Sequence, residues 1–303
     1  MKPEPTIRQL RHFLSLAQHC HFSRAAEVCL ITQSSLSASI RELESVLDCQ
    51  LFERTKRTVL LTPMGRDLVG MAKGIVADLD DLTEHARGGG LPLTGELTMG
   101  VIPTIGPFLL PRVLPGLRKD YPDLKLFLRE EKSASLLQLL SEGALDLALI
   151  ALPYNTDGFE TLAIADDPFL AVFPRGHDLS DFETMTPARL KKFDLLTLES
   201  GNCLTDQTLA MRRPGTEGAA NRFQATSLHT LVQMVDNGLG LTVLPKMAVD
   251  TGILRGLKLD FRPFSSPHAS RHIALAWRKS SRRAKEFRLL GEHLRDELAT
   301  PLR

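Results

Sequence analysis

The sequence has no long apolar run. Its longest apolar stretch covers only residues 145–152, whereas a helix that crosses a bilayer needs about 18 or more such residues. Residues 1–5 contain two prolines and two charged side chains, and so lack the apolar segment of an export signal. We therefore expect a cytoplasmic protein that makes no contact with a membrane.

Cysteine is scarce. The chain of 303 residues has four cysteines, Cys20, Cys29, Cys49 and Cys203, and no C-x-x-C motif. Histidine pairs at metal-ligand spacing are missing too, so we expect neither a zinc site nor any other metal or cofactor. No expected strand is followed by G-x-G-x-x-G, and neither a phosphate-binding loop nor G-x-S-x-G occurs. These absences argue against an enzyme.

The charges balance overall but not locally. Lys and Arg number 37 against 36 Asp and Glu, which gives a net charge of +1. Up to Arg66, however, nine basic residues stand against six acidic ones, a weak indication of a nucleic-acid partner. The length, together with an apolar content of 43%, predicts about two domains that bury ordinary cores.

The N-terminal segment predicts three short helices. Ser23 can cap the second helix and Thr32 the third. Leu36, Ile40 and Leu43 give the third helix a buried apolar stripe. Its opposite face carries short or basic polar side chains that suit the major groove of DNA: Gln33, Ser34, Ser35, Ser37 and Arg41.

Residues 51–62 predict a short β-hairpin that carries three cations, Arg54, Lys56 and Arg57. Cations in such a hairpin neutralise phosphates and add affinity without reading sequence. The alternative interpretation is a small helical bundle with a charged hairpin and no DNA partner. Helix, turn, serine-rich helix and basic hairpin, taken together, favour DNA binding.

The order of these motifs resembles the LysR-type transcriptional regulators. The resemblance rests on Ser23-Arg24-Ala25-Ala26, on residues 32–37 and 40–44, and on residues 51–65. It implies a winged helix-turn-helix that binds double-stranded DNA, and it adds Ser23 and Arg24 to the candidate DNA-binding residues. An α/β enzyme fused to a DNA-binding module is a further alternative, which the missing catalytic motifs disfavour.

A long helix follows, with Thr62 as its cap and Pro63 at its first position. An apolar heptad stripe runs along it through Leu68, Ala72, Ile75, Leu79, Leu82 and Ala86. The helix either packs on its own domain or, as the narrow stripe and the glycines at 88–90 favour, pairs with a second copy. The resemblance implies a homodimer through this helix, commonly assembled into a homotetramer, with RNA polymerase as a further expected partner.

Residues 92–303 alternate between expected strands and helices. Strands at 97–101, 124–128 and 145–152 are separated by helices at 107–117 and 135–140, a pattern typical of a parallel sheet. The expected fold class is α/β, preceded by an all-α winged helix-turn-helix. The expected domains are residues 1–63, a linker helix at 64–91, and residues 92–303. By resemblance, the last is a two-lobed, periplasmic-binding-protein-like effector domain, with one lobe at 92–167 and 272–303 and the other at 168–271.

Cys203 stands where a strand should end and a helix begin. A helix N-terminus lowers the pKa of a thiol and favours the thiolate, the form that attacks peroxides. An inert buried cysteine is the plainer alternative. Residues 100–111, 225–228 and 240–245, with the stretch around Cys203, resemble the peroxide-sensing OxyR branch of the LysR family. The resemblance implies that Cys203 senses peroxide and that the protein activates oxidative-stress genes. The other candidates for a peroxide or effector pocket are Thr104, Ser133, Asn202, Asp206, Thr226 and Arg278.

Two positions depart from that branch. Its second, resolving cysteine lies nine residues after the first, where this chain has Arg212, and it usually has a histidine in place of Asn202. Cys203 could therefore stop at sulfenic acid or form a mixed or intermolecular disulfide, with Arg212 and Arg213 stabilising its anionic forms. The alternative is a regulator that responds to a reversible small-molecule effector, such as an anion, in the cleft between the lobes.

Overall fold

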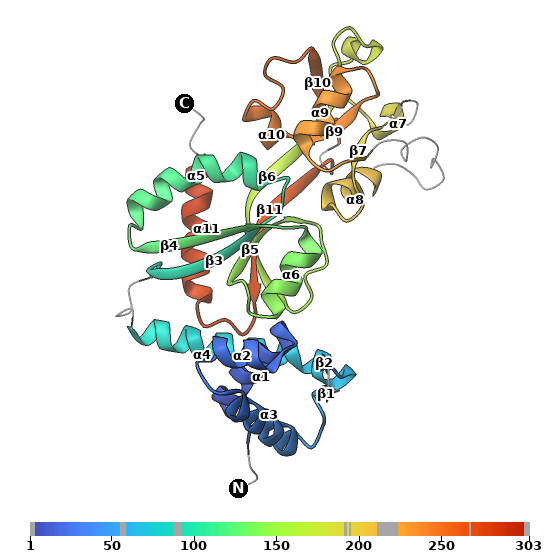
Figure 1. Cartoon of the computed structure of the whole chain (residues 1–303). Coiled ribbons are helices and arrows are strands. Elements are labelled where there is room, and N and C mark those ends of the chain that lie inside the picture. The colour runs from blue at the N-terminus through green and yellow to red at the C-terminus, as the bar shows by residue number, and fades with distance from the viewer. Residues whose placement is uncertain are drawn as a thin grey trace. The chain divides into compact units, whose positions relative to one another are not determined.

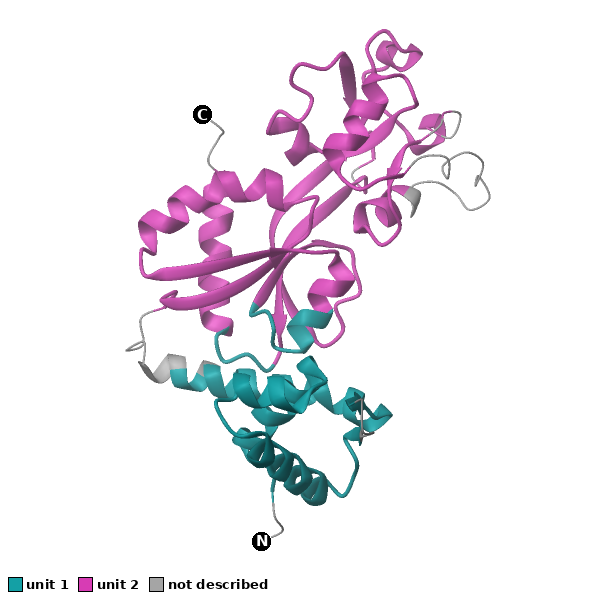
Figure 2. Cartoon of the chain, in the orientation of Figure 1, with its two compact units in different colours: residues 1–91, 138–146, 280–283 teal, residues 92–137, 147–279, 284–303 magenta. Residues whose placement is uncertain are grey.

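The structure is a computed structural model that describes residues 4–54, 59–87, 92–190, 193, 195–210, 224–266 and 268–299. Contacts within the chain divide it into two compact units (Figure 2). Unit 1 comprises residues 1–91 with two short segments, 138–146 and 280–283, and unit 2 comprises the remainder. Within the described ranges, no helix is both long and apolar enough to cross a membrane.

Unit 1 begins with three helices, α1 (Ile7–His19), α2 (Phe22–Val28) and α3 (Gln33–Leu47). The predicted helices are confirmed, and so is the Thr32 cap, whose hydroxyl accepts from the backbone N–H of Ser35 at 3.2 Å. The prediction that Ser23 caps α2 is wrong. The backbone is already helical at Phe22, so His21 is the cap, and Ser23 donates instead to the Gln33 side chain at 2.9 Å.

A short hairpin and a long helix complete the N-terminal part of unit 1. Strands β1 (Phe52–Arg54) and β2 (Val59–Leu61) pair antiparallel, as predicted. Lys56 and Arg57 lie outside the described residues, as does the side chain of Arg54. Helix α4 (Pro63–Arg87) follows, capped by the Thr62 hydroxyl, which accepts from the Gly65 N–H at 2.9 Å.

The apolar stripe of α4 divides between two environments. Leu68 and Ala72 pack into the core of unit 1 with the buried stripe of α3, which consists of Leu36, Ile40 and Leu43. Met71, Ile75 and Leu82 are exposed. The helix therefore packs on its own unit along one line and leaves a second apolar line open to solvent.

Unit 2 is built on a seven-stranded mixed sheet with the order β10-β6-β11-β5-β3-β4, and β9 pairs with β6 (Figure 1). Its strands are β3 (Gly95–Val101), β4 (Leu124–Glu130), β5 (Leu147–Leu152), β6 (Phe159–Pro174), β9 (Thr242–Pro245), β10 (Leu259–Pro263) and β11 (Ser270–Arg278). The expected parallel pairing is confirmed for β3 with β4 and with β5. The pairs formed by β6 and β11 are antiparallel, so the parallel pattern covers only part of the sheet.

Strand β6 belongs to both lobes of unit 2. Up to Pro168 it pairs with β11, and from Phe169 onward it pairs with β9. Its last residues also pair with β10. One long strand thus carries the chain from the first lobe into the second, and β11, which starts at Ser270, carries it back.

Helices cover both parts of this sheet. In the first lobe, α11 (Ala284–Ala299) packs on β6, β11 and α5 (Gly106–Asp120), and α6 (Ser133–Ser141) connects β4 to β5. The second lobe contains η1 (Asp178–Asp181), α7 (Pro187–Leu190), α8 (Cys203–Ala210), α9 (Leu228–Asp236), α10 (Lys246–Asp250) and the short strands β7 (Thr197–Leu198) and β8 (Gln224–Ala225). Its core surrounds Val172 and Phe173 of β6 and Leu231 and Val235 of α9. The periodicity of the sequence did not indicate β10, α7 or α10.

Candidate functional site

Cys203 is the first residue of α8 and is only 4% exposed. The turn that leads into it, residues 199–202, is fixed by its own polar groups. The Asn202 amide donates to the carbonyl oxygen of Glu199 at 3.2 Å, and the Thr205 hydroxyl donates to that of Leu198 at 2.9 Å. Gly201 has a φ of +86°, a conformation that favours glycine. The sulfur is therefore held at a defined place inside unit 2.

Four neighbours act on the Cys203 thiol. Burial raises its pKa above the ordinary value, and the carboxylate of Asp206 raises it further. The charge of Arg271, the hydroxyl of Ser133 and the backbone N–H of Leu204 each lower it. Burial dominates because a thiolate loses its hydration in the interior. The prediction that the helix N-terminus lowers this pKa is therefore wrong for the net effect, although groups that favour the thiolate are in place.

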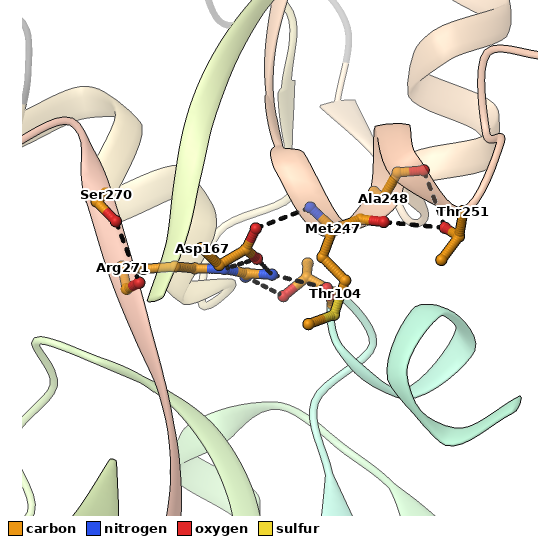
Figure 3. A network of polar contacts seen from close by, with 7 residues as sticks. All are labelled: Thr104, Asp167, Met247, Ala248, Thr251, Ser270 and Arg271. Atoms are coloured by element: carbon orange, nitrogen blue, oxygen red, sulfur yellow. Dashed lines mark hydrogen bonds and ion pairs between the residues drawn. The ribbon is translucent and has the colours of Figure 1, made fainter. Parts of the chain in front are cut away.

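Arg271 is fully buried and forms an ion pair with Asp167, which is 2% exposed (Figure 3). Nε and one terminal nitrogen of Arg271 donate to Oδ2 of Asp167 at 3.0 and 2.9 Å. Its guanidinium also donates to the hydroxyl of Thr104 at 2.8 Å and to the Thr104 carbonyl oxygen at 2.9 Å. The other oxygen of Asp167 accepts from the backbone N–H of Met247 at 2.8 Å. This network joins β6, β11, α10 and the segment after β3 at the point where β6 passes between the lobes.

Tyr154 lies close to both Cys203 and Asp206. Burial raises the pKa of its phenol, and the negative charges of these two neighbours raise it further. Sequence reasoning missed Tyr154 and Arg271. A signal for Tyr154 was its position just after the carboxyl end of the buried strand at 145–152, an edge where ligands bind in α/β sheets. For Arg271, the signal was a charge shortly before the apolar run at 273–277.

The structure brings some of the predicted pocket residues together and separates others. Ser133, Asn202 and Asp206 lie beside Cys203, while Thr104 contacts Arg271 instead. Thr226 is exposed. Arg278 lies at the far end of β11, seven residues from Arg271, or about 23 Å at about 3.3 Å per residue. The arginine whose charge acts on the thiol is thus Arg271, at the start of β11.

A cavity of about 150 Å³ lies on the Asp167 side of the network. Cations and carboxylates both line it, among them Arg112, Asp166, Lys246 and Asp250, together with Phe108 and Met247. Lys246 pairs with Asp250 at 2.5 Å. The cavity can hold a small polar molecule.

The candidate DNA-binding side chains gather on α2 and α3. Arg24, Gln33, Ser34, Ser35 and Arg41 are exposed, while Ser23 and Ser37 are half-buried. The hydroxyls of Ser34 and Ser35 lie 3.0 and 2.8 Å from that of Thr32 at the start of α3. The first turn of α3 therefore presents short hydroxyl and amide groups, which suit close contact with base edges.

The remaining cysteines belong to unit 1: Cys20 is exposed, and Cys29 and Cys49 are partly buried. Cys203 is the only cysteine after residue 49. Arg212, at the position where the OxyR branch has its resolving cysteine, lies outside the described residues, as does Arg213. Among the residues that the structure describes, no group of three or more His, Cys, Asp or Glu side chains could hold a metal ion.

Two family descriptions match the chain. Residues 7–66 match "Bacterial regulatory helix-turn-helix protein, lysR family", and residues 91–299 match "LysR substrate binding domain".

Individual proteins are similar over nearly the whole length. The "Probable hydrogen peroxide-inducible genes activator" of Streptomyces viridosporus is 40% identical over 97% of this chain and 95% of that protein. The "HTH-type transcriptional regulator EstR" of Acinetobacter baylyi is 37% identical over 98% of each chain. The solved structure of a full-length OxyR variant from Pseudomonas aeruginosa is 34% identical, with a TM-score of 0.80 over 97% of this chain and 95% of that one.

Proposed function

The chain belongs to the LysR family of bacterial transcriptional regulators and is OxyR-like, and from this premise we propose that it binds DNA as a homo-oligomer and responds to peroxide through Cys203. The observation that carries the redox role is the convergence of Ser133 and Arg271 on a buried thiol. Both groups favour negative charge on the sulfur, and peroxide chemistry requires that charge.

The proposed step begins with attack of the Cys203 sulfur on one oxygen of a peroxide. An S–O bond forms as the O–O bond breaks, so the sulfur is oxidised to a sulfenic acid and the peroxide is reduced to water or an alcohol. The thiol proton passes to the leaving oxygen. The Ser133 hydroxyl and the Arg271 guanidinium stabilise the charge that develops along this path.

The final product then depends on whether a second thiol reacts with the sulfenic acid. The effector domain, proposed at residues 92–303, contains no second cysteine, so no disulfide can form within it. The sulfenic acid persists, or it condenses with a small thiol or with a cysteine of another chain and releases water. Arg212 and Arg213 are proposed to stabilise its anionic forms.

The proposed partner of unit 1 is double-stranded DNA. The exposed first turn of α3 would enter the major groove, and Arg54, Lys56 and Arg57 of the hairpin would contact phosphates. The exposed line of Met71, Ile75 and Leu82 on α4 supports a homodimer, and a homotetramer and contacts with RNA polymerase during activation are proposed by analogy. A dimer would set two α3 helices about 34 Å apart on an inverted repeat. If Ile75→Glu leaves the mass measured by light scattering unchanged, this α4 interface is wrong.

A gel-shift assay on the protein's own upstream region tests the DNA-binding proposal. Ser34→Phe and Ser35→Phe should each weaken specific binding at least tenfold, because a bulky ring cannot fit against the base edges. Ser45→Phe is the matched control, since Ser45 is exposed in the last turn of the same helix. Sequence-blind binding that is insensitive to salt would reject the proposal.

Intact-mass measurement after mild peroxide treatment tests the redox proposal. Wild type should gain one oxygen atom, or a thiol adduct when a small thiol is present, and Cys203→Ser should gain neither at this position. A DNA footprint that changes on oxidation in wild type but not in Cys203→Ser would link the chemistry to regulation. An unmodified Cys203 with an unchanged footprint would exclude it.

The charged cavity favours a second candidate, a regulator of the same architecture that binds a reversible small-molecule effector. Its cations Arg112 and Lys246 would hold an anion of a few atoms. Thermal stabilisation by a small carboxylate such as acetate or succinate, lost in Lys246→Met, would support this candidate. If no such anion stabilises the protein, the cavity is not an effector site for anions.

A further inference from the structure

Lys132, in the segment between β4 and α6, reaches the turn that precedes Cys203. Its Nζ lies 2.7 Å from Oε1 of Glu199 and donates to the carbonyl oxygen of Ser200 at 3.2 Å. The stem of the lysine passes over Gly201, where an added Cβ atom would lie 3.6 Å from Cδ of Lys132. A single side chain of the first lobe therefore holds both the side chain and the main chain of a turn in the second lobe.

The next residue, Ser133, faces the interior. It is 1% exposed, its hydroxyl lowers the pKa of the Cys203 thiol, and that hydroxyl has no hydrogen-bond partner among the described residues. Lys132 thus contacts the outer side of the turn, while the next residue, Ser133, lies on the inner side, next to the thiol. Because Cys203 is only 4% exposed, a bulky reagent reaches the sulfur only when this packing opens.

We propose that the Lys132–Glu199 ion pair is a latch that sets the size of oxidant admitted to Cys203. With the pair formed, the turn stays over the thiol and only small peroxides enter. With the pair broken, bulky organic hydroperoxides and bulky thiol reagents enter as well. The step itself is the same for each oxidant: a sulfenic acid forms, and an organic hydroperoxide leaves as its alcohol.

The exposure of the pair sets the strength of the latch. Lys132 is 38% exposed and Glu199 41% exposed, so water and salt weaken their attraction. Breaking such a pair should raise the open fraction by up to about fivefold, or about 1 kcal/mol. The latch therefore selects among oxidants by the rate at which each reaches Cys203, and it adds little to the stability of the fold.

The test measures access directly, by peptide-level mass spectrometry of Cys203 in the full chain. Two alkylating reagents are compared, the small iodoacetamide and the bulky pyrene maleimide. In Lys132→Met and in Glu199→Gln, the ratio of bulky to small modification rates should rise about two- to fivefold over wild type. The swapped variant Lys132→Glu with Glu199→Lys should return toward the wild-type ratio.

Two controls separate the latch from a general effect of charge. Lys125→Met, which removes an exposed lysine from β4, should leave the ratio unchanged. High salt should raise the ratio in wild type but not in Lys132→Met, because salt screens only an existing pair. An unchanged ratio in both Lys132→Met and Glu199→Gln would overturn the proposal.

The latch rests on the proposed redox role of Cys203, and a second measurement keeps the two ideas apart. The rate of sulfenic acid formation with cumene hydroperoxide, relative to hydrogen peroxide, should rise in Lys132→Met. If the alkylation ratio rises while neither peroxide oxidises wild type, the redox role fails and the control of access stands. If both peroxides oxidise wild type with relative rates that Lys132→Met leaves unchanged, selection of oxidants by the latch fails.

Discussion

Asp167→Asn removes the charge from one side of the buried ion pair that joins the two lobes. In wild type, this carboxylate accepts two bonds from Arg271 and one from the backbone of Met247, all at 2.8 to 3.0 Å. Because Arg271 has no exposed surface, its charge would remain buried without a compensating carboxylate. Loss of one partner from such a pair costs about 3 to 5 kcal/mol, a large part of the roughly 5 to 15 kcal/mol that stabilises a domain.

Urea unfolding followed by tryptophan fluorescence measures this loss. Trp277 is the only tryptophan of the chain. It is fully buried on β11, the strand that also carries Arg271, so its emission reports on unit 2. With a urea dependence of about 2 to 3 kcal/mol per molar, the midpoint should fall by more than about 1 M.

The matched control is Asp166→Asn on the neighbouring residue. Asp166 is 77% exposed, and its pairing with His272 at 2.5 Å is therefore in water, where ion pairs contribute little. The urea midpoint of Asp166→Asn should equal that of wild type within experimental error. The double variant Asp167→Leu with Arg271→Met should recover roughly half of the loss, because it leaves no buried charge. Equal midpoints for Asp167→Asn and Asp166→Asn would refute the assignment of this pair as a stabilising contact between the lobes.

Two further predictions concern pH. Asp206→Asn should lower the pKa of the Cys203 thiol and Ser133→Ala should raise it, since the Asp206 carboxylate opposes the thiolate and the Ser133 hydroxyl favours it. The pH at which iodoacetamide labels Cys203 at half its maximal rate should therefore fall in the first variant and rise in the second. Shifts in the same direction in both variants would contradict this account. His12, buried and 2.7 Å from the Ser39 hydroxyl of α3, has a pKa lowered first by burial, so the neutral ring is the folded form. The stability of unit 1 should be complete above the unfolded-state pKa of about 6.5 and fall as pH drops below it. Thermal unfolding by circular dichroism should show this loss in wild type and not in His12→Asn.

The parts of the fold that depend on short-range pattern were predictable from the sequence. The buried stripe of Leu36, Ile40 and Leu43 and the Thr32 cap define α3 within a dozen residues, because helix periodicity and capping are local properties. The buried run at 145–152 likewise predicted β5. The Ser23 cap failed because the helix already begins at Phe22 with His21 as its cap, and the Ser23 hydroxyl bonds to Gln33 instead.

For the proposed redox site, the sequence predicted Cys203 and two of its neighbours but not the arginine that acts on the thiol. Cys203, Ser133 and Asp206 followed from a resemblance in sequence, and the structure places them together. Arg271 was missed and Arg278 chosen instead, although both are arginines near the expected return of the chain. Which of them reaches the thiol depends on the register of β11, and a single strand does not reveal its register.

The amino-acid sequence by itself determined the helix-turn-helix, the alternation of strands and helices, and the absence of a second cysteine in the effector domain. Tertiary structure alone decided the pKa of Cys203 and the partner of Arg271. Asp167 lies 104 residues from Arg271 in the chain, and only the pairing of β6 with β11 brings them together. Burial, which reverses the expected shift of the thiol pKa, is likewise a property of packing from every side.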